Sequence, residues 1–160
     1  MNSKRLILLL ATHLSIAVMG FMAGIYTLPI LIAQPAPLES DLLAVSSRAI
    51  VSAKFERHLQ DSDFLHFGEG EVFISQHAIA FVGTLAPGPD YQLYLSPEFV
   101  ETELDFNRLK AQMVQVGAVK TFNNFLVALP AHIDPTHYNT VIVWCDSFNQ
   151  FITSAQYQHR

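Results

Sequence analysis

The sequence predicts an all-β domain, an antiparallel β-sandwich or a barrel-like relative of one, preceded by a single N-terminal transmembrane helix. Three observations lead to this prediction. An uncharged, apolar run extends from Leu6 to Ala33. From Asp61 onward, short segments rich in Val, Ile, Phe and Tyr alternate with turns, at spacings of about 8–12 residues. No long helical pattern separates these segments.

The apolar run is long enough to cross a bilayer. As a helix, the stretch from Leu6 to Leu28 would extend about 34 Å at ~1.5 Å per residue, and a hydrocarbon core is about 30 Å thick. A cleaved signal peptide is the alternative, but its apolar region is only about 7–15 residues long and ends in a small-x-small site. Here Leu31 stands two positions before Ala33. We therefore expect an uncleaved signal-anchor over residues 6–33, in contact with the lipid bilayer.

Charge predicts the orientation of this anchor. Lys4 and Arg5 precede it, whereas Glu39 and Asp41 follow it. Because basic flanks stay in the cytoplasm, residues 1–5 are expected to be a cytoplasmic tail. The remainder of this single-pass membrane protein is then extracytoplasmic, and periplasmic if the cell is bacterial.

The predicted extracytoplasmic part is acidic. Without Lys4 and Arg5 it holds seven basic residues against fourteen acidic ones, a formal net charge of −7 with His neutral. Nucleic acids and anionic membrane surfaces select clusters of Lys and Arg. This balance argues against both as partners, so we expect no nucleic-acid binding.

Residues 34–54 are expected to form a linker or stalk. Pro35 and Pro37 disfavour continuation of the helix and lead the chain away from the membrane. Residues 40–60 fit a helix or a strand, because their apolar side chains follow both periods. We expect a short helix first, then a strand near residues 50–55, and the β-domain over residues 55–158.

The domain is predicted to contain seven or eight strands. The strongest signal is the segment from Thr140 to Cys145, which includes the only Trp and the only Cys of the chain. Because its apolar residues are consecutive, this strand is expected to be buried on both faces. The other predicted strands cover residues 50–55, 71–75, 78–82, 91–95, 113–116, 124–128 and 148–157.

The connections are predicted from their polar, Gly and Pro residues. Gln76-His77 is typical of a hairpin turn, and Asp146-Ser147 fits either a hairpin or a corner between two sheets. Gly68-Glu-Gly70 predicts a turn or bulge. Residues 97–108 are acidic and are expected to form a surface loop with one helical turn.

A second turn motif is stiffer. Pro87, Gly88, Pro89 and Asp90 predict a rigid turn, since each proline fixes φ. Gly88 between them is free to take a positive φ, and the side chain of Asp90 is expected to close the turn. Ligand binding is the alternative role for Asp90.

Four motifs occur in order along the domain: His66-Phe-Gly-Glu-Gly-Glu-Val72, Gly83-Thr-Leu-Ala-Pro-Gly-Pro-Asp-Tyr-Gln-Leu-Tyr-Leu95, Ala128-Leu-Pro130 and Thr140-Val-Ile-Val-Trp-Cys-Asp-Ser-Phe-Asn-Gln-Phe151. Together they resemble the DM13 domain family, known as electron transfer DM13, over roughly residues 55–157. The Pro-Gly-Pro-Asp turn and the later Trp-Cys-x-x-Phe pattern carry the resemblance as a pair.

The resemblance implies a β-sandwich-like module, of a kind that often accompanies DOMON and cytochrome-type domains in extracellular proteins. It also implies a redox role through a single cysteine, here Cys145. The sequence departs from the family at Ala86, where glycine often precedes the turn. No cytochrome or DOMON pattern accompanies the domain in these 160 residues.

Cys145 has two interpretations. It has no intrachain disulfide partner, and its apolar strand favours a buried, inert thiol. The alternative is a redox thiol that forms a mixed disulfide or a sulfenic acid, shielded by Trp144. Asp146 would raise the pKa of this thiol, whereas His66 or His77 would lower it from across the fold. Cys145 is therefore the redox candidate, with Trp144, His66 and Asp90 as supporting candidates.

Other chemistry has weaker signals. The sequence has no Gly-x-Ser-x-Gly, His-Glu-x-x-His, Walker or Rossmann motif, so no catalytic residue is assigned. His132 and His137 lack the further ligands of a zinc site, and haem has no Cys-x-x-Cys-His. We predict no metal ligands and leave the cofactor unknown. Two functions follow: a membrane-anchored redox accessory with a protein partner, or a non-catalytic binding or scaffolding module.

Overall fold

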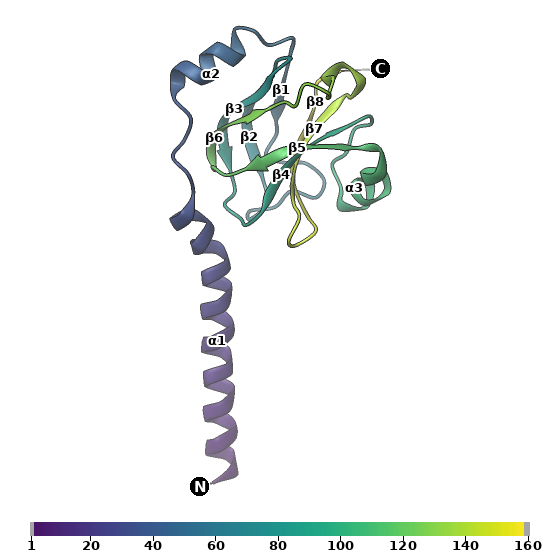
Figure 1. The fold of residues 1–160 in the computed structure, drawn as a ribbon. Helices are drawn as coiled ribbons and strands as arrows, with labels where there is room; N and C mark the ends of the chain where they lie inside the picture. Colours follow the sequence, from purple (N-terminus) through teal and green to yellow (C-terminus); the bar gives the residue numbers. More distant parts are fainter. Residues whose placement is uncertain (1, 159–160) are drawn as a thin grey trace.

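Two antiparallel sheets packed face to face form the body of the protein, and one long helix projects from an end of this sandwich (Figure 1). The structure is a computed structural model and describes residues 2–158. The predicted all-β sandwich behind an apolar N-terminal helix is confirmed.

Each sheet has four strands. The first has the order β1-β2-β3-β6, with β1 at Val51–Phe55, β2 at Gly68–Ile74, β3 at Ala78–Leu85 and β6 at Asn123–Ala128. The second has the order β5-β4-β7-β8, with β5 at Val114–Val119, β4 at Tyr91–Ser96, β7 at Thr140–Cys145 and β8 at Gln150–Gln156. Eight strands were the upper number expected, and the hairpins at Gln76-His77 and Asp146-Ser147 are both formed.

The helix α1, Ser3–Ile32, is long and apolar enough to cross a membrane, and none of its most apolar window is buried. The last turns of the helix, from Met22 onward, lie beside the sandwich, where Pro29 is buried and the N–H of Gln34 donates to the carbonyl of Lys120 at 3.2 Å. The chain then runs to α2, Glu39–Ser46, which buries Leu42. The short helix expected before the first strand is therefore present.

The strand β7 organises the core. All six of its residues are buried, as its unbroken apolar sequence predicts. Side chains alternate between the two faces of a strand. Val143 and Cys145 therefore face the other sheet, in the inner core. Trp144 points the opposite way, into a second cluster with Phe106.

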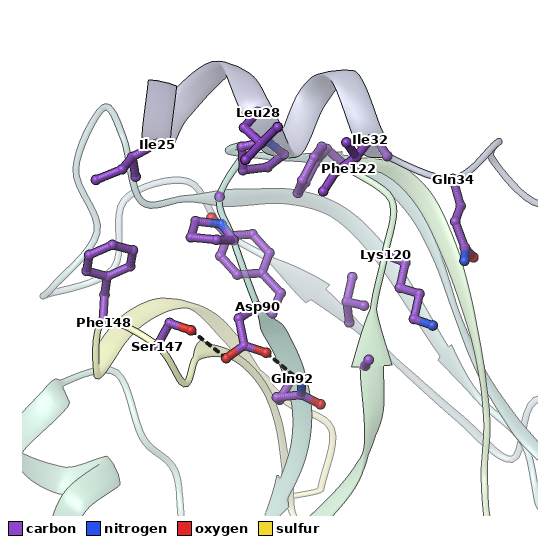
Figure 2. A pocket seen from close by; sticks show the side chains of 17 residues that line it. Ile25, Leu28, Ile32, Gln34, Asp90, Gln92, Lys120, Phe122, Ser147 and Phe148 are labelled. Atoms are coloured by element: carbon purple, nitrogen blue, oxygen red, sulfur yellow. Dashed lines mark hydrogen bonds between the residues drawn. The ribbon is translucent and has the colours of Figure 1, made fainter. Parts of the chain in front are cut away.

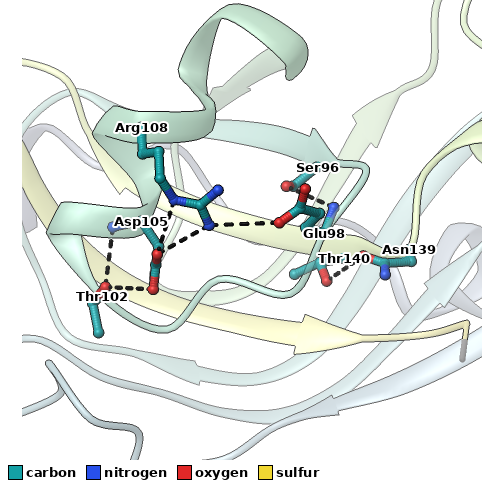
Figure 3. Close-up of polar contacts among 7 residues, drawn as sticks. All are labelled: Ser96, Glu98, Thr102, Asp105, Arg108, Asn139 and Thr140. Carbon is teal, nitrogen blue, oxygen red and sulfur yellow. Dashed lines mark hydrogen bonds and ion pairs between the residues drawn. The ribbon is translucent and has the colours of Figure 1, made fainter. Parts of the chain in front are cut away.

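That second cluster lies under α3, Glu103–Leu109, which continues into a 3-10 turn at Lys110–Gln112. Thr102 caps the helix by accepting the N–H of Asp105 at 3.1 Å, and Arg108 pairs with Asp105 at 3.1 Å (Figure 3). The prediction of an acidic surface loop with one helical turn is thus right for the polar residues and wrong for the apolar ones. Its polar residues face solvent, but Phe106 anchors the helix in the core.

Gly68-Glu-Gly70 is not a turn, and this prediction was wrong. These residues are the first three of β2. The glycines there allow close contact between strands and do not form a turn. Gly70 has φ +145° and pairs with Gly83 on β3, so the two backbones approach where a side chain would collide. A further 3-10 turn, Pro135–His137, precedes β7.

Candidate functional site

Cys145 ends β7 at the α1 end of the sandwich, and its side chain points inward. The residue is only 2% exposed. Its thiol donates a hydrogen bond to the carbonyl of Pro89, with Sγ and O 2.9 Å apart. Cys145 is thus covered by the turn from Pro87 to Asp90, which we call the Pro-Gly-Pro-Asp loop.

Hydrogen bonds hold this loop closed. The hydroxyl of Tyr91 donates to the carbonyl of Ala86 at 2.9 Å, and the N–H of Asp146 donates to the carbonyl of Asp90 at 3.2 Å. Gly88 lies against the Tyr91 ring, where a Cβ would be 2.8 Å from Cζ. The loop therefore needs glycine for close packing.

The backbone of the loop reverses at its last residue. Asp90, not Gly88, has the positive φ, at 56°. Asp tolerates this left-handed conformation better than most residues, because its short side chain bonds locally. Gly88 has no positive φ, and the left-handed residue is the one after Pro89.

The carboxylate of Asp90 does not close its own turn, which corrects a further expectation. It accepts from the hydroxyl of Ser147 at 2.7 Å and from the side-chain amide of Gln92 at 3.1 Å (Figure 2). Ser147 lies in the turn between β7 and β8, 57 residues away in sequence. Asp90 therefore ties the Pro-Gly-Pro-Asp loop to the hairpin that carries Cys145.

The surroundings keep the Cys145 thiol protonated. Burial raises the pKa of this thiol above its ordinary value, and the carboxylates of Asp90 and Asp146 raise it further. Backbone N–H groups of Phe148 and Ser147 oppose the shift only partly. The expected influence of Asp146 on the Cys145 pKa is confirmed, and thiolate is scarce at neutral pH.

Trp144 does not shield Cys145, contrary to expectation. Neighbouring residues on a strand point to opposite faces, so the indole lies on the far side of the sheet. It stacks on Phe106 with ring centroids 3.7 Å apart and planes 7° apart. Its N–H has no hydrogen-bond partner among the described residues.

The two histidine candidates differ in position. His66 lines a cavity of about 240 Å³ together with Cys145, and its Nδ1 is 3.1 Å from a carboxylate oxygen of Asp63. His77 lies in the turn before β3, at the opposite end of the strand from the Pro-Gly-Pro-Asp loop. The structure thus brings His66 to the Cys145 cavity but not His77.

Helix α1 forms one wall of this end. Met22 and Tyr26 border the Cys145 cavity, and a larger, open groove of about 580 Å³ lies between Leu28 on α1 and Phe122 on the sandwich (Figure 2). Sequence reasoning missed these α1 residues, because an apolar helix gives no signal of what its last turns contact. It also missed Tyr91, although its strand pattern was identified.

No metal site is evident within residues 2–158: no three His, Cys, Asp or Glu side chains converge there. His132 and His137 lie in the loop before β7, and both are exposed. His137 contacts Asp134, with Nε2 and Oδ2 3.9 Å apart. The side chains that line the cavity with Cys145 include the imidazole of His66 and the phenol of Tyr26.

Loosening the Pro-Gly-Pro-Asp loop is expected to expose the thiol. Ser147→Ala removes the hydroxyl that Asp90 accepts, so Cys145 should react about two- to tenfold faster with dithiodipyridine, a small uncharged disulfide. Ser47→Ala is the matched control, because the Ser47 hydroxyl donates to the carbonyl of Ala44 at the C-terminal end of α2, away from the loop. Equal rates in Ser147→Ala and the unaltered protein would contradict this role for Ser147.

Comparison with known proteins identifies the fold family. The sequence model of the family described as Electron transfer DM13 matches residues 59–157. Neither the curated proteins nor the solved structures gave a match. The matched segment contains the Pro-Gly-Pro-Asp loop and Cys145 and covers more than half of the chain. The chain therefore belongs to the DM13 family.

Proposed function

We propose that the protein is a membrane-anchored, extracytoplasmic accessory of a redox system and acts through Cys145. Membership of the DM13 family supports a redox role, and α1 supports membrane anchoring. Lys4 and Arg5 before α1, with Glu39 and Asp41 after it, support an extracytoplasmic domain. The partner is a protein that carries a disulfide.

One observation carries the choice of Cys145. Although the residue is nearly buried and belongs to the inner core cluster, it also lines the cavity between α1 and the sandwich. The Pro-Gly-Pro-Asp loop covers the thiol at this cavity, because the carbonyl of Pro89 accepts its hydrogen bond and Asp90 ties the loop to Ser147. Opening this loop is a smaller change than unfolding a sheet.

The reaction is thiol–disulfide exchange. Cys145 loses its proton to solvent, and the thiolate attacks one sulfur of the partner's disulfide. A bond forms between Sγ and that sulfur, the partner's S–S bond breaks, and its second sulfur leaves as a thiolate. No external oxidant is needed. The raised pKa of Cys145 keeps this step slow while the loop is closed.

Dithiodipyridine tests this proposal on the full chain in nanodiscs. We expect the native protein to react at a single thiol, at a rate that continues to rise above pH 9.0, because the folded-state pKa of Cys145 is raised above that ordinary value. Cys145→Ser should not react. A thiol that stays silent in the native protein and reacts only after denaturation would overturn the proposal.

The second candidate is a non-catalytic binding or scaffolding module. The 2% exposure of Cys145 and the hydrogen bond of its thiol to Pro89 favour it, since both are typical of a core cysteine. Under this hypothesis Cys145→Ser leaves partner capture unchanged. The silent native thiol described above is the result that would make this function the leading one.

A further inference from the structure

The end of the sandwich that holds Cys145 also exposes aromatic side chains. Phe64 is 80% exposed, in the loop between β1 and β2, and Phe148 is 54% exposed, in the turn between β7 and β8. Leu65, next to Phe64, is 38% exposed. Large apolar side chains at the tips of two neighbouring loops indicate a contact surface.

The position of α1 shows what lies beside these tips. Leu65 lines the Cys145 cavity together with Met22 and Tyr26 of α1. Phe148 lines both the cavity and the groove, at the same end of the groove as Ile25 (Figure 2). The tips therefore lie level with residues 22–26 of the helix, not above its end.

The length of α1 sets the depth of that level. From Leu6 to Ile25, a helix rises about 30 Å, which matches the hydrocarbon core of a bilayer. Tyr26 then falls at the boundary between lipid chains and head groups, where tyrosine is enriched. Phe64, Leu65 and Phe148 would meet the bilayer at the same boundary.

The charged groups at this end do not oppose such a position. Asp63 contacts His66 at 3.0 Å, and Asp90 accepts hydrogen bonds from Ser147 and Gln92. Asp146 accepts from the Tyr94 hydroxyl at 3.1 Å and lies 3.7 Å from Lys110. Each carboxylate thus has a partner.

The acidic domain has no electrostatic attraction to an anionic surface, so the contact would be apolar and would suit zwitterionic lipid. Aromatic side chains at the interfacial depth are the usual basis of such contact.

We propose that the α1 end of the sandwich is seated in the bilayer interface, with the loops at residues 63–66 and 146–149 inserted among the lipid head groups. This inference rests on the proposed membrane anchoring. It deepens that proposal, because the groove and the Cys145 cavity then open toward lipid. A partner would approach the Pro-Gly-Pro-Asp loop along the membrane surface.

Spin labels test the depth of the loops in the full chain. The single native cysteine is first removed as Cys145→Ser, and Phe64→Cys or Phe148→Cys then carries a nitroxide in nanodiscs of phosphatidylcholine. Leu104→Cys is the matched control, since Leu104 is also 80% exposed but lies on α3. Met19→Cys reports on the anchor itself. Trp144 fluorescence checks that each variant is folded.

Oxygen concentrates in lipid, whereas a nickel complex stays in water. We expect the ratio of relaxation by oxygen to relaxation by the nickel complex to be several-fold higher for the labels at positions 64 and 148 than for the label at position 104. If both loop labels give the same ratio as position 104 while position 19 is in lipid, the loops are not in the bilayer interface, but α1 is still a membrane anchor. If position 19 is itself in water, membrane anchoring is wrong, and the inference falls with it.

Discussion

Replacing Trp144 with alanine is expected to lower the free energy of unfolding by about 3–5 kcal/mol, the range for removing a large aromatic side chain from a core. Trp144 is 0% exposed and stacks on Phe106, which joins α3 to the sheet. Its loss leaves a cavity that the fixed strand β7 cannot fill. Denaturant unfolding of the full chain in detergent, followed by circular dichroism, measures the change.

Two control variants separate the causes. Phe148→Ala removes an aromatic ring that is 54% exposed and should change the free energy of unfolding in detergent by less than about 0.5 kcal/mol. Trp144→Phe should lose much less than Trp144→Ala, because it keeps an aromatic ring and the indole N–H it removes has no partner within residues 2–158. If Trp144→Ala is as stable as the unaltered protein, α3 is not held by this stack.

The same Trp144→Phe variant tests the separation of the two faces of β7. Trp144 lies in the outer cluster and Cys145 in the inner one. Trp144→Phe should therefore leave the reaction rate of Cys145 with dithiodipyridine unchanged. A large acceleration would mean that the indole protects the thiol after all.

The strands were predictable because their signals are local. Six consecutive buried residues in β7 follow from its apolar sequence, and the hairpin turns follow from short polar pairs. The period of two along a strand also separates Trp144 from Cys145, but proximity in sequence suggested the opposite. That error came from the interpretation, since the sequence already contained the information.

The closure of the site was not predictable, because it depends on contacts between distant segments. Pro89 and Cys145 are 56 residues apart in sequence, and Asp90 and Ser147 are 57 apart. Nothing in one sequence indicates which turn covers which strand end. The left-handed φ fell on Asp90 rather than Gly88 for the same reason, since the loop bends to meet the β7–β8 turn.

A substitution at the glycine pair Gly70 and Gly83 is also expected to lower the free energy of unfolding strongly. Gly83→Val is expected to lower the free energy of unfolding by about 3 kcal/mol or more, at the upper end of overpacking. A Cβ at position 83 would collide with the carbonyl of Glu69 and lie 2.7 Å from the Gly70 Cα. These are backbone atoms, which cannot rotate away. Gly117→Ala is the control, because its Cβ would meet only a methyl of Val127, at 3.1 Å.

Gly83→Val should also affect Cys145, because β3 ends at Leu85 and leads directly into the Pro-Gly-Pro-Asp loop. Separating β3 from β2 moves the start of that loop, where Ala86 accepts the Tyr91 hydroxyl. Under conditions in which Gly83→Val remains folded, its thiol should therefore react faster than that of the unaltered protein, and Gly117→Ala should not. If Gly83→Val is destabilised but its thiol rate is unchanged, the loop closes independently of β3, and the hydrogen bonds to Asp90 alone control access to the thiol.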